Sequence, residues 1–189
     1  MDATMFLWIG LMAVAGLTVL LYNRLVGLRH AINNAFGDVD VQLKQRTDLI
    51  PNLVETVKGS AAHESGVLQK VTEARAAAVG ATTLKDRAAA EGALSGALTQ
   101  LFGVAESYPD LKANENFRQL QGELGDIENK IAAARRFLNN SVAEYNAAIE
   151  QFPSVLLARL FGFRSAEMFA LDAAERTAAR QPPKVSFGS

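Results

Sequence analysis

The chain of 189 residues contains no cysteine, only two histidines and only five prolines. Without cysteine there is no disulfide and no thiolate nucleophile or ligand, and the zero count fits a reducing compartment. The scarcity of proline, beside abundant Ala, Leu, Glu, Arg and Gln, favours helix over sheet. A formal net charge of −1 provides no domain-wide basic field for phosphates, so we expect no nucleic acid partner.

The sequence also lacks the motifs of common catalytic and cofactor sites. No HExxH, no GxxxxGK[ST], no GxGxxG after a strand and no GxSxG elbow occurs. The two histidines, His30 and His63, fall on different predicted helices, and a zinc site would need both of them plus carboxylates. The carboxylates are scattered along helix faces and do not converge. We therefore expect no enzyme activity, no catalytic residue, no metal site and no cofactor.

The longest uncharged stretch runs from Ala3 to Asn23 and contains the apolar run Met5–Tyr22. About 20 residues of helix, at roughly 1.5 Å each, cover the ~30 Å hydrocarbon core of a bilayer. Residues 1–23 are therefore predicted to be a transmembrane anchor that contacts lipid. Its membrane-spanning positions include Met5, Trp8, Leu11, Val14, Leu17, Leu20 and Tyr22.

A cleaved signal peptide is the alternative to an anchor. The triplet Ala13-Val14-Ala15 resembles a cleavage site, but it lies in the middle of the apolar run, and Asp2 stands where a signal peptide carries Lys or Arg. The anchor is the interpretation that these residues favour. Because Arg24 and Arg29 follow the span, the positive-inside rule places the N-terminus outside and the body in the cytoplasm.

Beyond the anchor, apolar residues at spacings of three and four predict helices throughout. The first stripe runs from Leu25 to Val57, continues from the span with little break, and ends at Gly59-Ser60. Pro51 interrupts this stripe, so a kink is expected just before it. Two shorter helices are expected over residues 61–79 and 84–106.

A longer helix is predicted to start near Tyr108-Pro109-Asp110 and to stop at Pro153. Its stripe from Phe117 to Ile149 has coiled-coil-like spacing and needs a partner of similar length, for which the first helix is the obvious candidate. The sequence thus predicts an all-α fold. A transmembrane helix continues into an elongated antiparallel bundle, residues 24–169, with two long and two or three shorter helices. A last short helix, residues 165–180, ends in the C-terminal segment 170–189, whose remainder is a flexible tail.

After Pro153 comes the apolar segment Val155–Phe163, with Ser154 expected to cap a short helix there. Helix lengths would return this segment to the membrane surface, so one interpretation places it in the bilayer interface. The expected interface residues are Leu156, Arg159, Phe161, Phe163 and Arg164. The other interpretation is that the segment covers the end of the bundle core.

Polar residues stand beside apolar positions within the long stripes. They are Arg46, Asn52, Arg75, Asn139, Asn140 and Asn146. A polar site inside the bundle would explain them, and so would a hydrogen-bonded network that fixes helix register. The second use of polar core positions is the better attested, and we favour it.

Seven short motifs are spread along the chain beyond the apolar run. They are Arg46–Val54, His63-Glu64, Ala74-Arg75, Tyr108–Lys112, Ala143–Asn146, Phe152-Pro153 and Leu160–Phe163. In their residues and their order, over about residues 22–169, they resemble the LemA family of bacterial membrane proteins. The resemblance implies one N-terminal membrane helix and an all-α body with long antiparallel helices. It implies no established activity or cofactor, and it links some members to membrane organisation or to membrane-protein partners.

We therefore expect a single-pass protein of a bacterial inner membrane that acts as a non-enzymatic helical scaffold. An elongated body would leave side surface for assembly, so a homo-oligomer is expected, with a membrane protein as a further partner. The alternative is an accessory or regulatory subunit of a membrane protease or transporter. A third class, a metal- or phosphate-dependent enzyme, has no ligand set in its favour.

Overall fold

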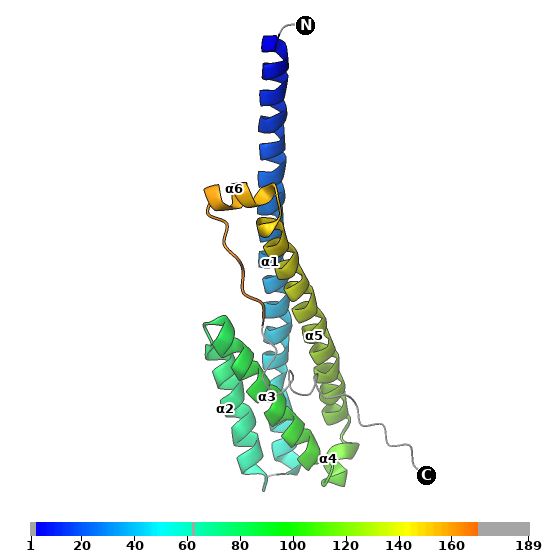
Figure 1. Cartoon of the computed structure of the whole chain (residues 1–189). Coiled ribbons are helices and arrows are strands. Elements are labelled where there is room, and N and C mark those ends of the chain that lie inside the picture. Colours follow the sequence, from blue (N-terminus) through cyan, green and yellow to red (C-terminus); the bar gives the residue numbers. More distant parts are fainter. Residues whose placement is uncertain (1–2, 62, 170–189) are drawn as a thin grey trace, which may run out of the picture. The chain divides into compact units, whose positions relative to one another are not determined.

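The computed structural model in Figure 1 describes residues 3–61 and 63–169. These residues form helices and no strand, which confirms the all-α prediction. The helices are α1 (Ala3–Ser60), α2 (Ser65–Gly80), α3 (Leu84–Ala105), α4 (Pro109–Ala113), α5 (Glu115–Glu150) and α6 (Ser154–Leu160). The chain folds into two compact units. Unit 1 is drawn from Met1–Val41 and Ile131–Met168, and unit 2 from Gln42–Lys130 and Phe169–Ser189. The predicted boundary between anchor and body at residue 23 stays a prediction.

Helix α1 is continuous over 58 residues and includes Pro51. Proline removes one backbone donor, yet the helix does not end there, because Ile50 and Leu53 on either side are fully buried and hold it. Pro51 itself is exposed. The helix ends at Ser60, as Gly59-Ser60 predicted.

Helix α2 begins at Ser65, so the predicted start at residue 61 is wrong. Ala61 directly follows α1, and its N–H still donates to the carbonyl of Val57 at 2.8 Å. A turn follows, in which the Glu64 N–H donates to the carbonyl of Ala61 at 3.0 Å. Residues 63 and 64, which were predicted to be helical, therefore belong to the connection between the two helices.

Side-chain caps start α3 and α5. The Thr83 hydroxyl accepts from the Asp86 N–H at 3.1 Å and donates to the Asp86 carboxylate at 2.6 Å, which fixes the first turn of α3. The predicted long helix is interrupted at Asn114, whose side-chain oxygen accepts from the Phe117 N–H at 3.3 Å and caps α5. The short α4 before it begins at Pro109, the helix position where a missing N–H costs nothing.

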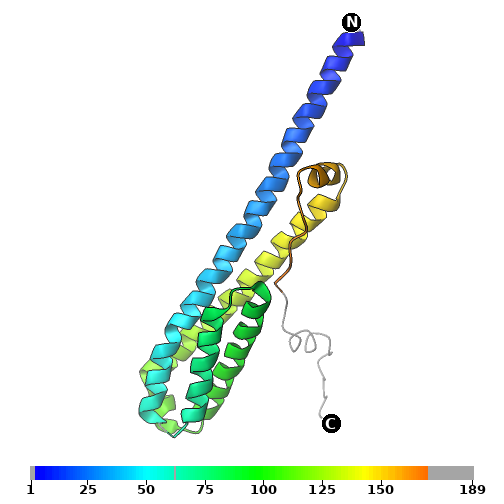
Figure 2. The same ribbon diagram turned by 90° about the vertical axis from the view of Figure 1, so that its left-hand side faces the viewer.

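In unit 2, the parts of α1 and α5 that belong to it pack with α2, α3 and α4 around one core (Figure 2). The rings of Phe102 and Phe117 meet edge to face across this core, with centroids 6.1 Å apart. The buried members are Ile50, Leu53, Val57, Ala61, Leu68, Val71, Ala78, Leu94, Leu98, Leu101, Ala105, Leu111, Phe117 and Leu124. Ile50, Leu53 and Val57 come from the first predicted stripe and Phe117 and Leu124 from the second, so the 3.6-residue period identified the core faces of these two helices correctly.

In unit 1, the first part of α1 and the last part of α5 supply most of the buried side chains, and Tyr22 of α1 contacts Phe161, which follows α6. The buried side chains of α1 are Leu25, Ile32, Ala35 and Val39, and those of α5 include Leu138, Val142, Tyr145 and Ile149. Nearly all belong to the two long stripes that the sequence predicted to pair.

The prediction that Ser154 caps α6 is wrong. Ser154 is the first residue of that helix, and its hydroxyl donates to the carbonyls of Ala148 and Gln151 at 2.7 and 3.0 Å. These carbonyls belong to the end of α5 and the turn after it, so Ser154 completes the preceding helix. A further correction concerns the predicted helix over 165–180. Residues 165–169 are not helical, and the rest of it lies outside the described residues.

Candidate functional site

The predicted membrane-spanning side chains all lie exposed on α1. Met5, Trp8, Leu11, Val14, Leu17, Leu20 and Tyr22 are all among the exposed large hydrophobic residues. An 18-residue stretch of this helix has a mean hydropathy of 2.2, and none of it is buried inside the protein. A large apolar surface of this kind is unfavourable in water. The segment is long and apolar enough to cross a membrane.

The expected interface residues lie on and just after α6. Leu156 is 60% exposed and Phe161 is 53% exposed, whereas Ala158 on the opposite side of the helix is buried. Arg159 and Arg164 are exposed, and Phe163 is half-buried. Helix α6 therefore has one side packed against the rest of unit 1 and another that presents apolar side chains outward.

Tyr22, at the end of the apolar run, contacts the residues that follow α6. Its ring lies edge-on to that of Phe161, with centroids 4.9 Å apart, and to that of Phe163, with centroids 5.9 Å apart. Aromatic pairs with such geometry contribute beyond their buried area. The structure thus brings together two groups of predicted site residues, the last of the span and the apolar segment near Phe163.

We name residues 163–166 the strap, because they run back from Gly162 along α5 without helical structure. The side chain of Asn146 donates to the carbonyl of Ala166 at 3.0 Å and accepts from its N–H at 2.9 Å. The Tyr145 hydroxyl donates to the carbonyl of Arg164 at 3.0 Å. The strap is therefore held by side chains at successive positions of one helix, and this use of Asn146 was not predicted.

A second polar cluster lies in the interior of unit 2, around Arg46. Its guanidinium forms an ion pair with Glu91 of α3 and, at 2.6 Å, with Glu128 of α5, and it donates to the Ser95 hydroxyl at 2.9 Å. Arg46 is 1% exposed and Glu91 is 2% exposed, whereas the Glu128 side chain is 50% exposed. This cluster ties three helices of unit 2 together.

The sequence identified Arg46 as a polar gap in a stripe but did not identify Glu91. The available signal was the four-residue spacing of Glu91 and Ser95, which puts two polar groups on one helix face beside Leu94 and Leu98. Among the other polar residues of the stripes, Arg75 donates from Nε to the carbonyl of Thr47 at 2.8 Å.

Hydrogen bonds between helices, which the favoured interpretation predicted, are thus present at Arg46 and Arg75, whereas Asn146 binds the strap. Asn52 and Asn140 instead lie exposed.

A third polar contact links the start of α2 to the start of α4. The Tyr108 hydroxyl donates to Glu64 at 2.8 Å. This hydrogen bond, together with partial burial and the negative charge of Glu64, raises the pKa of Tyr108 above its ordinary value of 10.0. The contact bridges two segments far apart in the sequence, and its loss would loosen the end of the bundle where they meet.

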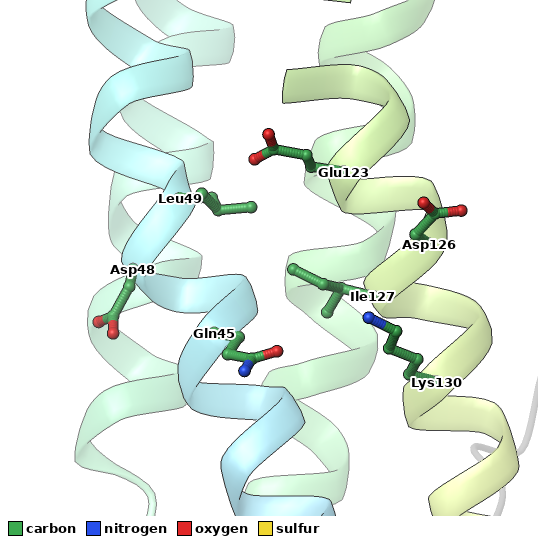
Figure 3. A pocket seen from close by; sticks show the side chains of 7 residues that line it. All are labelled: Gln45, Asp48, Leu49, Glu123, Asp126, Ile127 and Lys130. Carbon is green, nitrogen blue, oxygen red and sulfur yellow. The ribbon is translucent and has the colours of Figure 1, made fainter. Parts of the chain in front are cut away.

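Unit 2 carries a groove of about 370 Å³ between α1 and α5. In Figure 3 the side chains of Leu49 and Ile127 point into the space between the two helices, and Glu123 lies above them. The other lining residues are Gln45, Asp48, Asp126 and Lys130. The groove has an apolar floor and a largely acidic rim, which suits an apolar side chain flanked by basic ones.

Comparison with known proteins agrees with this architecture. A sequence model of the LemA family matches residues 35–187. The magnetosome protein MamQ of Magnetospirillum gryphiswaldense is 28% identical over 82% of this chain and 68% of its own length. The magnetosome proteins MamQ 1 and MamQ 2 of Paramagnetospirillum magneticum are each 26% identical over 78% of this chain and 64% of their own length. The chain thus spans about two thirds of the length of these curated relatives. The family match and the exposed apolar part of α1 together indicate a membrane-associated protein.

Proposed function

Because this chain belongs to the LemA family, we propose that it is a membrane-anchored, non-enzymatic scaffold that self-associates in a bacterial inner membrane. The observation that carries the proposal is the composition of α1. Its first part is apolar and exposed, and its last part supplies Ile50, Leu53 and Val57 to the core of unit 2. One helix thus belongs both to a lipid-facing segment and to a folded body.

The proposed orientation places the N-terminus outside and the body in the cytoplasm. Arg24 and Arg29 follow the apolar run directly, and Lys and Arg next to a span favour the cytoplasmic side. Because the chain contains no cysteine, single cysteines introduced as Thr4→Cys and Ser107→Cys report orientation without background. We expect a membrane-impermeant maleimide on intact cells to reach the first and not the second. The opposite pattern would reverse the proposed topology.

Self-association is supported by apolar side chains exposed outside the predicted span. Val41, Val79 and Phe137 are each more than half exposed, and such side chains contribute to contacts between copies. The test is the native size of the full-length protein in mild detergent. A large and homogeneous homo-oligomer is the expected result, and a protein that remains monomeric at all concentrations would contradict the scaffold.

The groove between α1 and α5 favours the alternative, an accessory subunit of a membrane protease or transporter. Reversing its rim charges with Glu123→Lys and Asp126→Lys would weaken a basic partner segment by electrostatic repulsion. Glu144→Lys changes an exposed carboxylate of α5 away from the groove and serves as the control. If a membrane protein co-purifies with the unaltered chain and is lost only with the groove variant, the accessory function gains support over the scaffold.

A further inference from the structure

Unit 1 contains a cavity of about 330 Å³ that neither the anchor nor the scaffold requires. Three segments line it: the part of α1 that follows the apolar run, α5 at Tyr145, and the chain from Gly162 through the strap. Arg29 lies on the α1 side and Arg164 on the strap side. Two arginines that are far apart in the sequence therefore reach one cavity.

The lining of this cavity suits an anion. Within the part of the chain that the structure describes, no Asp or Glu lines it, and neither arginine forms an ion pair with a carboxylate. Asn33 and Ser165 add hydrogen-bond donors. The planar guanidinium binds phosphate oxygens in pairs, so two of them at one cavity favour a phosphate group.

The opposite part of the lining suits hydrocarbon. Phe36, Ile32 and Phe163 contribute apolar surface to the same cavity. Inorganic phosphate or a sugar phosphate would leave this surface in contact with water. A ligand that carries both a phosphate and an aliphatic part would use the whole lining.

The position of the cavity along α1 matches the headgroup layer of a bilayer. Arg29 lies seven residues after Tyr22, about 10 Å along the helix at 1.5 Å per residue. Helical side chains point back toward the N-terminus of their helix, here toward the apolar run, and long arginine side chains extend further in that direction. The headgroup layer on each side of a bilayer is roughly 5 to 8 Å thick. The Arg29 guanidinium thus falls at the depth of the lipid phosphates if the apolar run spans the hydrocarbon.

The strap holds Arg164 in place before any ligand arrives. Its backbone is fixed by the hydroxyl of Tyr145 and by the two hydrogen bonds between the Asn146 side chain and the Ala166 backbone. The chain enters the strap through Gly162, and the N–H of Phe163 donates to the carbonyl of Ala158 at 2.9 Å. A preordered backbone lowers the entropic cost of binding.

We infer that this cavity binds the phosphate headgroup of an anionic phospholipid, with Arg29 and Arg164 as its ligands for the phosphate. The acyl chains would lie beside the exposed apolar part of α1, and Phe36 and Phe163 would contact the glycerol and upper chain. The inference rests on the proposed membrane anchoring, because the depth argument requires the apolar run to span the bilayer.

The experiment measures short-chain phosphatidylglycerol binding to the full-length protein in mild detergent by native mass spectrometry. We compare the unaltered chain with Arg29→Gln/Arg164→Gln and with a matched control, Arg118→Gln/Arg136→Gln, which removes two exposed arginines of α5 that do not line the cavity. Each arginine near a membrane surface contributes about fivefold to the affinity for anionic lipid, so the first pair is expected to lose about thirtyfold. The control pair is expected to lose less than about threefold. A further variant, Ser165→Trp, fills the cavity while keeping both arginines, and it too should reduce binding.

Two further measurements distinguish a phospholipid from free phosphate as the ligand. Phosphatidylcholine of the same chain length should bind more weakly than phosphatidylglycerol, and inorganic phosphate should not compete. Equal loss in the cavity and control pairs would overturn the site, and effective competition by inorganic phosphate would overturn the lipid as its ligand. Carbonate extraction of membranes tests the anchor separately. If the protein stays in the membrane but the cavity variants bind lipid as the unaltered chain does, the lipid site is refuted and the anchor is not. If carbonate releases the protein from membranes, the proposed anchor is refuted.

Discussion

The guanidinium of Arg46 and the carboxylate of Glu91 form an ion pair in which both side chains are almost wholly buried. Removing one partner would leave the other charge buried and unpaired. We expect Arg46→Met to lower the free energy of unfolding by about 3–5 kcal/mol. Urea titration of the full-length protein in mild detergent, followed by far-UV circular dichroism, measures this loss.

Replacing both partners tests whether the loss comes from the orphaned charge. Because Glu128 is half exposed, water can solvate it when Arg46 is gone. We expect Arg46→Met combined with Glu91→Leu to recover most of the lost stability, since apolar replacements of buried ion pairs are often neutral or stabilising. Arg118→Met, at an exposed position of α5, is the control and should change little. A double variant as unstable as the single one would show that the pair contributes through packing.

The contact between Tyr108 and Glu64 predicts a pH dependence. The pKa of Tyr108 is higher in the folded protein than its ordinary value of 10.0, so the hydrogen bond contributes fully to stability below that pH. The contribution is lost as the pH rises through the raised pKa, because the tyrosinate cannot donate and repels the carboxylate. Spectrophotometric titration should show a midpoint above 10.0 for Tyr108.

Two variants identify the group responsible for this titration. Glu64→Gln should return the raised midpoint toward 10.0, because the negative charge is removed. Tyr108→Phe should abolish the raised midpoint and flatten the stability curve in the same alkaline range. If the raised midpoint persists in the Tyr108 variant, it belongs to another tyrosine and the assignment is wrong.

The two hydrogen bonds between the Asn146 side chain and the Ala166 backbone predict how firmly the strap is held. Asn146→Ala removes both, at about 1 kcal/mol each, and the strap should detach locally without global unfolding. Hydrogen–deuterium exchange of peptides that contain residue 166 should become faster by about tenfold or more. Asn140→Ala, an exposed position on the same helix, is the matched control. Unchanged exchange in the Asn146 variant would mean that other contacts hold the strap.

The exposed side of α6 predicts a second attachment to the bilayer. In a chain that lacks residues 1–23, replacing Leu156 and Phe161 by Glu should weaken binding to anionic vesicles by about tenfold or more, since each apolar side chain contributes roughly 1.5–3 kcal/mol when buried. Val79→Glu/Phe137→Glu changes two other exposed apolar residues and is the control. Vesicle cosedimentation measures the difference. If both variants bind vesicles equally, the segment Val155–Phe163 does not attach to the bilayer, and covering the end of the bundle core is the interpretation that remains.

Much of the fold could be predicted because it follows from local pattern. The stripes from Leu25 to Val57 and from Phe117 to Ile149 depend only on the period of the helix, and their residues line the cores of the two units. The end of α1 and both ends of α3 lie at or within one residue of their predicted positions. These are features that a short window of sequence determines.

The rest depends on partners that are distant in sequence. Glu91 lies in an Ala-rich helix, and glutamate is a residue type that is usually exposed to solvent. Only its ion pair with Arg46, 45 positions away in the sequence, explains its burial. Ser154 has the local pattern of a helix cap but completes the end of α5 instead. The cavity of unit 1 joins Arg29 and Arg164, which no spacing rule connects.

Gly162 has a φ of +73°, a left-handed conformation that is costly for ordinary residues. A Cβ added there would meet nothing within 4 Å, so the surroundings leave ample room for a larger side chain. The constraint at residue 162 is therefore the positive φ, which L-residues rarely adopt, and not a lack of space for a side chain. A D-alanine introduced at residue 162 by chemical ligation would adopt this backbone conformation without strain. L-alanine, the smallest chiral residue of the genetic code, would be strained there.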